Sequence, residues 1–197
     1  MRLILASTSP FRSALLTAAG LSFQCEKPNF EEYLDQTLEP DTLALLLAEG
    51  KASAVADLHP DCIVIGADQV GEIQGHLLGK PHTPQEARAQ LERLSGKTHR
   101  LVTGVVVMGV TEPSGARPTL RFAEVTRITF RSLSSELLDA YVATGEWEGC
   151  AGAYRLEGRG IQLVASIEGD WHNIIGLPVL RVLEALRRLG LEPLLDG

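Results

Sequence analysis

Residues 3–16 read LILASTSPFRSALL and combine a short apolar run, a hydroxyl-rich turn and the start of a helix. Ser9 is a good N-cap residue, and Pro10 suits the first helical position. A turn of this kind directs backbone N–H groups, the hydroxyls of Ser7 and Ser9, and the Arg12 guanidinium at one spot. A helix dipole, free donors and a guanidinium together favour phosphate binding. The alternative is that Ser9-Pro10 is only a well-capped helix start.

Strand-like and helix-like segments alternate along the chain, which predicts an α/β fold with a mixed sheet. Apolar runs predict strands at 2–6, 22–25, 61–67 and 161–167, and a hairpin over 70–78 that turns near Gly75. Residues 100–110 and 120–131 are rich in Val, Thr and Ile and are typical of a long strand pair. Capping residues and helical spacing predict helices at 10–19, 40–57, 84–94, 134–144 and 176–189. The Gly-rich section 145–160 is expected to be irregular, and a cleft between two lobes is expected at the strand ends.

Composition restricts the function classes. The chain has 197 residues, of which 45% are hydrophobic, so it can bury a sizeable core. A net charge of −7 argues against a general nucleic-acid binder, although local cations could still hold a phosphorylated ligand. No apolar run approaches the roughly 20 residues of a membrane span. We expect no secretion signal, because the apolar start at Leu3–Ala6 is short and runs into polar residues. Three distant cysteines without metal-ligand spacing predict a cytoplasmic protein without structural zinc.

Several charged residues stand where sites often form. Asp68 directly follows a buried apolar run, which places it at a strand end, although most such aspartates cap a turn. Lys80 lies between Gly79 and Pro81, which restrict the backbone on either side. Glu32 lies in an acidic loop, whereas Lys51, taken alone, is better explained as part of a solvated helix face. The histidines at 59, 76, 82 and 99 are scattered and are expected to be exposed.

Together these residues have the side chains that hydrolysis of a phosphoanhydride bond requires. Glu32 and Asp68 would hold a divalent ion or activate water. The groups that would bind phosphate are Ser7, Ser9, Arg12, Lys51 and Lys80. No GxxxxGK[ST] motif is present, which argues against a P-loop kinase or ATPase.

Eight short motifs occur in order between residue 3 and about residue 190. They are Ser7-x-Ser9-x-x-Arg12-x-x-Leu15-Leu16, Leu47-Ala48-x-x-Lys51-Ala52, Gly66-Ala67-Asp68, Gly79-Lys80-Pro81, Leu94-Ser95-Gly96, Thr103-Gly104, Gly152-Ala153-Tyr154 and Gly176-Leu177-Pro178. In these motifs the chain resembles the Maf-like nucleoside triphosphate pyrophosphatases.

The resemblance implies a single domain over residues 1–197 that hydrolyses a nucleoside triphosphate between its α and β phosphates. It implies an elongated α/β fold with a central cleft, like that of inosine triphosphate pyrophosphatases. It also implies a requirement for a divalent metal, Mg²⁺ or Mn²⁺, and Asp68 as the proton acceptor. From the residues themselves we predict Asp68, Glu32 and Lys80 as catalytic, with Asp68 and Glu32 as metal ligands. The sequence leaves open whether Asp68 is the base or a metal ligand. A homodimer is common in such enzymes, and no nucleic-acid or membrane partner is expected.

Three positions bear on the choice of base. The branch of the family that acts on dTTP and UTP usually has Arg, Thr and Gln where this chain has Phe11, Gln69 and Glu157. The chain instead matches the pattern of the branch that acts on 7-methyl-GTP. An aromatic ring such as Phe11 can stack on a cationic purine, and a carboxylate such as Glu157 can accept from its N–H edge. The alternatives are that Phe11 is a core residue and Glu157 a solvated loop carboxylate.

These observations predict an enzyme that converts 7-methyl-GTP to 7-methyl-GMP and diphosphate and so removes modified nucleotides from the pool. The first alternative is a dTTP/UTP pyrophosphatase of the same family. The second is a non-catalytic nucleotide-binding regulator of cell division.

Overall fold

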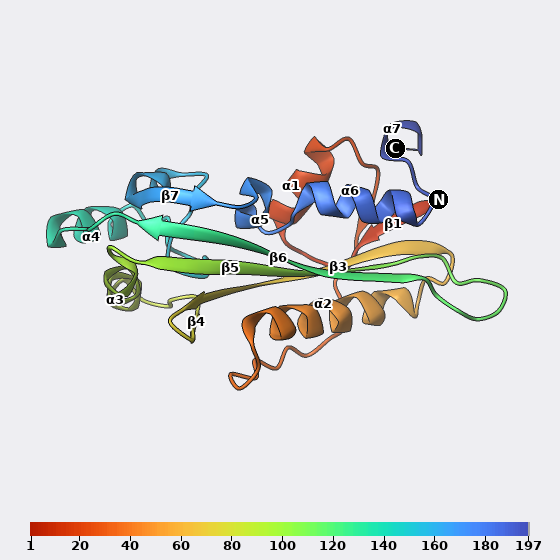
Figure 1. The fold of residues 1–197 in the computed structure, drawn as a ribbon, viewed down its shortest axis with the longest axis horizontal. Coiled ribbons are helices and arrows are strands. Elements are labelled where there is room, and N and C mark those ends of the chain that lie inside the picture. The colour runs from red at the N-terminus through yellow and green to blue at the C-terminus, as the bar shows by residue number, and fades with distance from the viewer. Residues whose placement is uncertain (197) are drawn as a thin grey trace. The chain divides into compact units, whose positions relative to one another are not determined.

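A computed structural model describes residues 1–196, in which seven strands form one sheet (Figure 1). The strands are β1 (Arg2–Leu5), β2 (Gln24–Cys25), β3 (Cys62–Ile73), β4 (His76–Leu78), β5 (Thr98–Met108), β6 (Thr119–Phe130) and β7 (Val164–Glu168). The helices are α1 (Pro10–Ala18), α2 (Pro40–Ala56), α3 (Pro84–Leu94), α4 (Ser135–Val142), α5 (Trp171–Ile175), α6 (Val179–Arg188) and α7 (Pro193–Asp196), with a 3₁₀ helix at Arg159–Leu163. The strand order is β2-β1-β3-β5-β6-β7, and β4 pairs with β3. Parallel and antiparallel pairs both occur, so the predicted mixed α/β fold is confirmed.

The chain divides into two compact units. Unit 1 comprises Met1–Gln69, Thr103–Glu124 and Gly176–Gly197, and unit 2 comprises Val70–Val102 and Val125–Ile175. Strands β3, β5 and β6 contribute residues to both units. Among residues 1–196, no helix is both long and apolar enough to cross a membrane.

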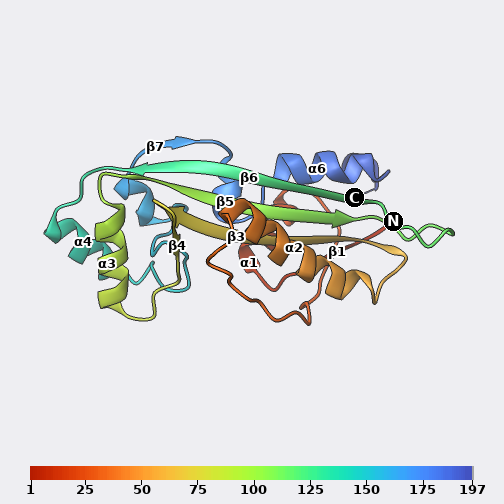
Figure 2. The same cartoon turned by 60° about the horizontal axis from the view of Figure 1, so that its bottom comes forward.

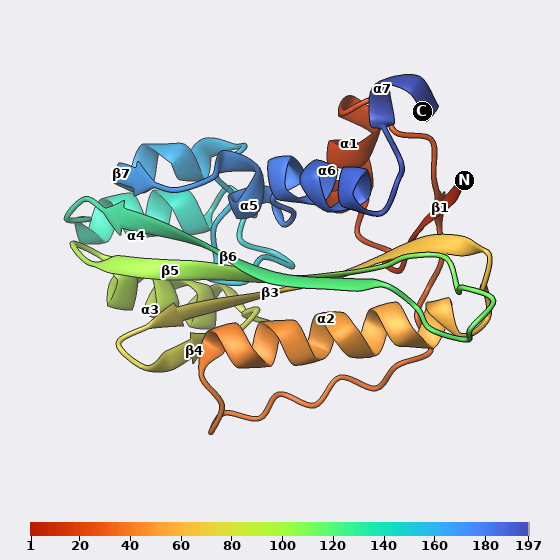
Figure 3. The same cartoon turned by 45° about the vertical axis from the view of Figure 1, so that its right-hand side comes forward.

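Unit 1 has three layers. Strand β1 pairs in parallel with β2 and with β3, in a register that joins Arg2 to Cys62 and Leu5 to Ile65. Helix α2 covers one face of these strands, while α1 and α6 cover the other (Figures 1 and 3). Because both faces are covered, the first seven residues of β3 are buried without the alternation of a half-exposed strand.

Unit 2 is built around a tight hairpin and a helix pair. Gln74 and Gly75 both have positive φ, 52° and 81°, which is the geometry of a type I′ turn and confirms the predicted hairpin. Helices α3 and α4 lie side by side (Figure 2), where the Arg88 Nε donates to Asp139 Oδ1 at 2.7 Å. Trp147 is buried in the core of this unit, and its indole N–H donates to the Val142 carbonyl at 3.0 Å.

Three predicted elements have clearly different bounds in the structure, and two helices were not predicted. Strand β3 continues to Ile73 instead of ending before Asp68, because no turn residue interrupts it before Gln74-Gly75. The predicted strand at 161–167 is a 3₁₀ turn followed by β7 over 164–168. The predicted helix at 176–189 begins only at Val179, since Gly176 has a φ of +125°, which a right-handed helix cannot contain. Helices α5 and α7 were not predicted.

His99 is buried, so the prediction that it is exposed is wrong. It is 1% exposed on β5 and shares a 2.7 Å hydrogen bond with the Tyr154 hydroxyl. Its ring also meets the Phe130 ring edge-on, with the centroids 5.2 Å apart. Burial lowers the pKa of His99 to about 4, while the nearby Glu72 carboxylate opposes this shift.

This burial makes stability depend on pH. A histidine in the unfolded chain takes up a proton below about pH 6.5, whereas His99 in the folded chain stays neutral down to about pH 4. The contribution of the neutral His99 to the free energy of unfolding is therefore complete above pH 6.5 and is lost as the pH falls toward 4. We expect the free energy of unfolding, measured in urea, to fall by roughly 2 kcal/mol between pH 7 and pH 5. His99→Gln should remove most of this dependence, and His82→Gln, at an exposed histidine, should retain it.

Candidate active site

The hydroxyl-rich turn folds as its residues predict. The Ser9 Oγ accepts from the Arg12 backbone N–H at 3.4 Å, and the Ser7 Oγ accepts from the Ser9 N–H at 3.1 Å. A hydroxyl that accepts a hydrogen bond still carries a hydrogen to donate. Ser9 therefore caps α1 and keeps the ability to bind phosphate, so the two interpretations of this turn are compatible.

Arg12 is anchored to the start of the C-terminal helical region. Its Nε donates to the Gly176 carbonyl at 2.9 Å, which uses one of the five N–H donors of a guanidinium. Burial lowers the pKa of Arg12, and the carboxylates of Asp68 and Glu32 raise it in opposition. Those two carboxylates therefore lie within electrostatic reach of the guanidinium in unit 1.

Lys51 connects the two candidate catalytic carboxylates. Its Nζ lies 2.5 Å from the Asp68 Oδ1 and 2.8 Å from the Glu32 Oε1. The side chains of Lys51 and Asp68 are only 9% and 12% exposed, whereas that of Glu32 is 50% exposed. Lys51 therefore does not belong to a solvated helix face. Lys51 thus makes a charge-assisted hydrogen bond to Asp68 and an ion pair with Glu32.

Asp68 lies inside β3, so its predicted place at a strand end is wrong. The strand continues for five residues beyond it, and all of these except Gln69 are buried. A carboxylate in such a strand needs a compensating charge, because an unpaired buried charge is very costly. Lys51 supplies that charge.

Glycines allow α2 to come close enough for this contact. A Cβ on Gly66 of β3 would lie 2.4 Å from the Ala48 carbonyl oxygen of α2. A Cβ on Gly104 of β5 would lie 2.3 Å from the Ala44 carbonyl oxygen. Backbone can approach backbone at these two points only because there is no side chain. The close approach of α2 then brings Lys51 within reach of Asp68.

A third glycine positions the acidic loop. A Cβ on Gly50 of α2 would lie 2.2 Å from the Phe30 ring, so the ring packs directly on the helix backbone. Phe30 precedes Glu32 by two residues and fixes the loop against α2 beside Lys51. These three glycine contacts are structural parts of the site that sequence reasoning missed. Gly66 and Gly104 stand within motifs that were noted, but nothing in the sequence shows what packs against them.

Two predicted specificity residues also belong to unit 1. Gln69 follows Asp68 on β3, and its Nε2 donates to the Thr103 Oγ1 at 3.2 Å. Phe11 is 39% exposed on α1, so it is not a core residue. Of the ten predicted site residues, unit 1 therefore contains Ser7, Ser9, Phe11, Arg12, Glu32, Lys51, Asp68 and Gln69.

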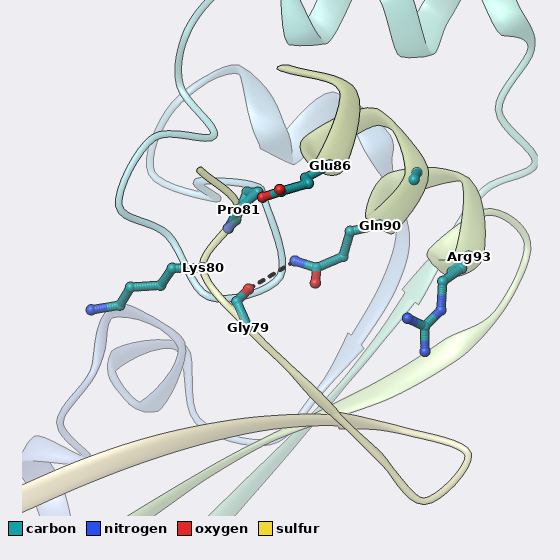
Figure 4. Close-up of a pocket in the computed structure, with 7 residues that line it drawn as sticks. Gly79, Lys80, Pro81, Glu86, Gln90 and Arg93 are labelled. Carbon is teal, nitrogen blue, oxygen red and sulfur yellow. Dashed lines mark hydrogen bonds between the residues drawn. The ribbon is translucent and has the colours of Figure 1, made fainter. Parts of the chain in front are cut away.

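Lys80 and Glu157 belong to unit 2. The Gly79 carbonyl accepts from the Gln90 Nε2 at 3.0 Å and from the Gly152 N–H at 3.3 Å, which holds the Gly-Lys-Pro segment in place. Figure 4 shows the Lys80 side chain extending away from α3 at a surface pocket of about 270 Å³. The residues that line this pocket are Gly79, Lys80, Pro81, Glu86, Ala89, Gln90 and Arg93.

Glu157 lies on a loop that unit 2 holds from two sides. Its Oε1 is 3.7 Å from the Arg155 Nε, and the Arg155 carbonyl accepts from the Gly160 N–H at 3.0 Å. The Glu146 carboxylate accepts from the Arg159 N–H at 2.7 Å. The carboxylate of Glu157 is thus presented by an ordered loop with one nearby cation.

The carboxylate pair fits a magnesium or manganese ion that is bound largely through its substrate. Within residues 1–196, no group of three or more His, Cys, Asp or Glu side chains is placed to hold a metal. Mg²⁺ in phosphate-transferring sites is commonly held by one or two carboxylates together with substrate phosphates. Asp68 and Glu32 meet this requirement, because carboxylates that share one ammonium lie close enough to share one cation.

The chain is similar to known proteins over almost all of its length. The chain matches a family model described as "Maf-like protein" over residues 2–189. It is 43% identical over 189 residues to the dTTP/UTP pyrophosphatase of Geobacillus sp. (strain WCH70), covering 96% of this chain and 98% of the relative. It is 42% identical over 191 residues to the dTTP/UTP pyrophosphatase of Moorella thermoacetica (strain ATCC 39073 / JCM 9320), covering 97% and 96%. It is 38% identical over 192 residues to that of Bacillus pumilus (strain SAFR-032), covering 98% of each chain.

Proposed function

Since the chain belongs to the Maf family and is a hydrolase of the phosphoanhydride bonds of nucleoside triphosphates, we propose that its substrates are dTTP and UTP. In this proposal each is converted to its monophosphate and diphosphate. The observation that supports the chemistry is the buried Lys51 ammonium between Asp68 and Glu32, beside the Arg12 guanidinium. Such a set offers both carboxylates for activating water and cations for neutralising phosphate.

The proposed reaction is attack of water on the phosphorus at one side of the α–β bridge. Asp68 accepts the proton of the attacking water, as a positioned carboxylate can. Arg12 and Lys51 neutralise charge that develops on the phosphate oxygens, an effect that is strong where water is excluded. The hydroxyls of Ser7 and Ser9 and the N-terminus of α1 orient the phosphates through hydrogen bonds.

We propose that Asp68 and Glu32 also hold the divalent cation that the family resemblance implies. A bound Mg²⁺ or Mn²⁺ would supply charge neutralisation and polarise the phosphoanhydride. The role of Lys80 as a phosphate ligand stays a prediction from the sequence. A homodimeric state and a cytoplasmic location stay predictions from the sequence.

The choice of base is where the relatives and the sequence motifs differ. The relatives are named dTTP/UTP pyrophosphatases, and this supports the alternative better than the 7-methyl-GTP assignment expected from the sequence. One observation favours the second candidate substrate, 7-methyl-GTP. Phe11, Gln69 and Glu157 are the residues expected of that branch, and Phe11 is exposed enough to meet a base.

A nucleotide panel separates the two candidates. With either Mg²⁺ or Mn²⁺, we expect kcat/KM for dTTP or UTP to exceed that for 7-methyl-GTP by about tenfold or more, measured by diphosphate release. Glu157→Gln should leave dTTP turnover nearly unchanged, because Gln is usual at this position in that branch, and should weaken 7-methyl-GTP turnover. A wild-type preference for 7-methyl-GTP would establish the second candidate. Equal losses on every nucleotide in Glu157→Gln would make Glu157 a structural residue.

A further inference from the structure

The charges around Lys51 balance without any ligand. Asp68 and Glu32 contribute two negative charges, and Lys51 and Arg12 contribute two positive ones. Lys51 donates a hydrogen bond to Asp68 and forms an ion pair with Glu32, and its own side chain is almost entirely buried. The cluster is therefore electrically satisfied before nucleotide binds.

The same contacts place the ammonium between the two carboxylates proposed to bind metal. A divalent cation bound to Asp68 and Glu32 would stand next to the Lys51 charge and would repel it, since the side chains of Lys51 and Asp68 are largely shielded from water. The cation could enter only if the ammonium left. Movement of a buried ammonium away from its carboxylates is strongly unfavourable unless another anion pairs with it.

We propose that Lys51 keeps a divalent cation out of the nucleotide-free site, so that metal binds only together with nucleotide. This inference rests on the proposed function and specifies the order of its binding steps. The triphosphate supplies the anion to which the Lys51 ammonium moves, and that movement frees both carboxylates for the cation. It also frees the Asp68 Oδ1 to accept a proton only when substrate is present. Lys51 thus acts twice, first as the counter-ion of the carboxylates and then as a phosphate ligand.

Direct binding of Mn²⁺ to the nucleotide-free protein tests this order. Free Mn²⁺ is measured by electron paramagnetic resonance while MnCl₂ is titrated into wild type, Lys51→Met and Lys97→Met. We expect Lys51→Met to bind Mn²⁺ about tenfold or more tightly than wild type, because one adjacent positive charge is removed. Lys97→Met, at an exposed lysine of unit 2, should match wild type. Wild type should acquire saturable Mn²⁺ binding when an α,β-methylene analogue of UTP is added.

Two further variants identify the site of the gained binding. Lys51→Met combined with Asp68→Asn should lose the gain, and Lys51→Gln should reproduce it if Lys51→Met does not fold. Equal Mn²⁺ affinities of wild type and both Lys51 variants without nucleotide would overturn the proposal. Tight Mn²⁺ binding by nucleotide-free wild type would also overturn it. If no nucleotide is hydrolysed but the Lys51 variants still gain Mn²⁺ binding, the proposed function fails and the counter-ion role stands.

Discussion

Asp68→Asn is expected to lower kcat for diphosphate release by roughly 10³-fold, which is within the range measured for loss of a general base. An amide has nearly the shape of the carboxylate, so the hydrogen bond from the Lys51 Nζ can persist. The amide cannot take a proton from water, and it removes one of the two negative charges that balance Lys51 and Arg12. Binding of a non-cleavable α,β-methylene nucleotide should therefore be retained or become tighter. Diphosphate release and calorimetric binding measure the two effects separately.

Asp61→Asn provides the matched control. Asp61 is an exposed aspartate that directly precedes β3 and forms an ion pair with Arg2. Its replacement should leave diphosphate release and nucleotide binding near wild type. If Asp68→Asn retained wild-type turnover, Asp68 would not be the base. If wild type bound nucleotides but released diphosphate from none of those tested, the chain would be better described as a non-catalytic nucleotide-binding regulator, the second alternative that the sequence suggests.

Structural features that depend only on residues close together in the sequence could be predicted from it. Ser9, Thr83 and Ser134 each accept a hydrogen bond from the backbone N–H three residues later, as N-cap residues do. The hairpin at Gln74-Gly75 also depends only on local conformation, since both residues must have positive φ. Local chemistry was sufficient for these elements, and for recognising the turn at residues 7–9 as a phosphate-binding candidate.

Features that depend on distant partners could not be predicted. Whether the Lys51 side chain is solvated or buried depends on Gly66 of β3 and Gly104 of β5, which let helix α2 approach the sheet. His99 is buried against Tyr154, which lies 55 residues away in the sequence. The sequence suggested an exposed histidine because the residues next to His99 are polar. Asp68 looked like the end of a strand because a carboxylate is unfavourable inside one. The compensating ammonium comes from a helix 17 residues earlier.

Gly66→Ala is expected to disrupt the site without touching any of its charged groups. The new Cβ would lie 2.4 Å from the Ala48 carbonyl oxygen and 2.7 Å from the Ala52 nitrogen, so the α2 backbone must move. Lys51 lies between these two residues on the same helix, and its Nζ would move away from Asp68. We expect a loss of about 1–3 kcal/mol in the free energy of unfolding, as for overpacked cores. We expect kcat/KM to fall by roughly 100-fold, as for a displacement of about 1 Å in a catalytic group.

Leu46→Ala distinguishes this effect from a general intolerance of α2 to substitution. Leu46 is 53% exposed on α2, and alanine has a high helix propensity. The stability of this variant should therefore lie within about 1 kcal/mol of wild type. Gly104→Ala, whose Cβ would meet the backbone of Ala44, should resemble Gly66→Ala. Urea unfolding and diphosphate release compare all three variants. Equal behaviour of Gly66→Ala and Leu46→Ala would mean that backbone contact between α2 and the sheet does not position Lys51.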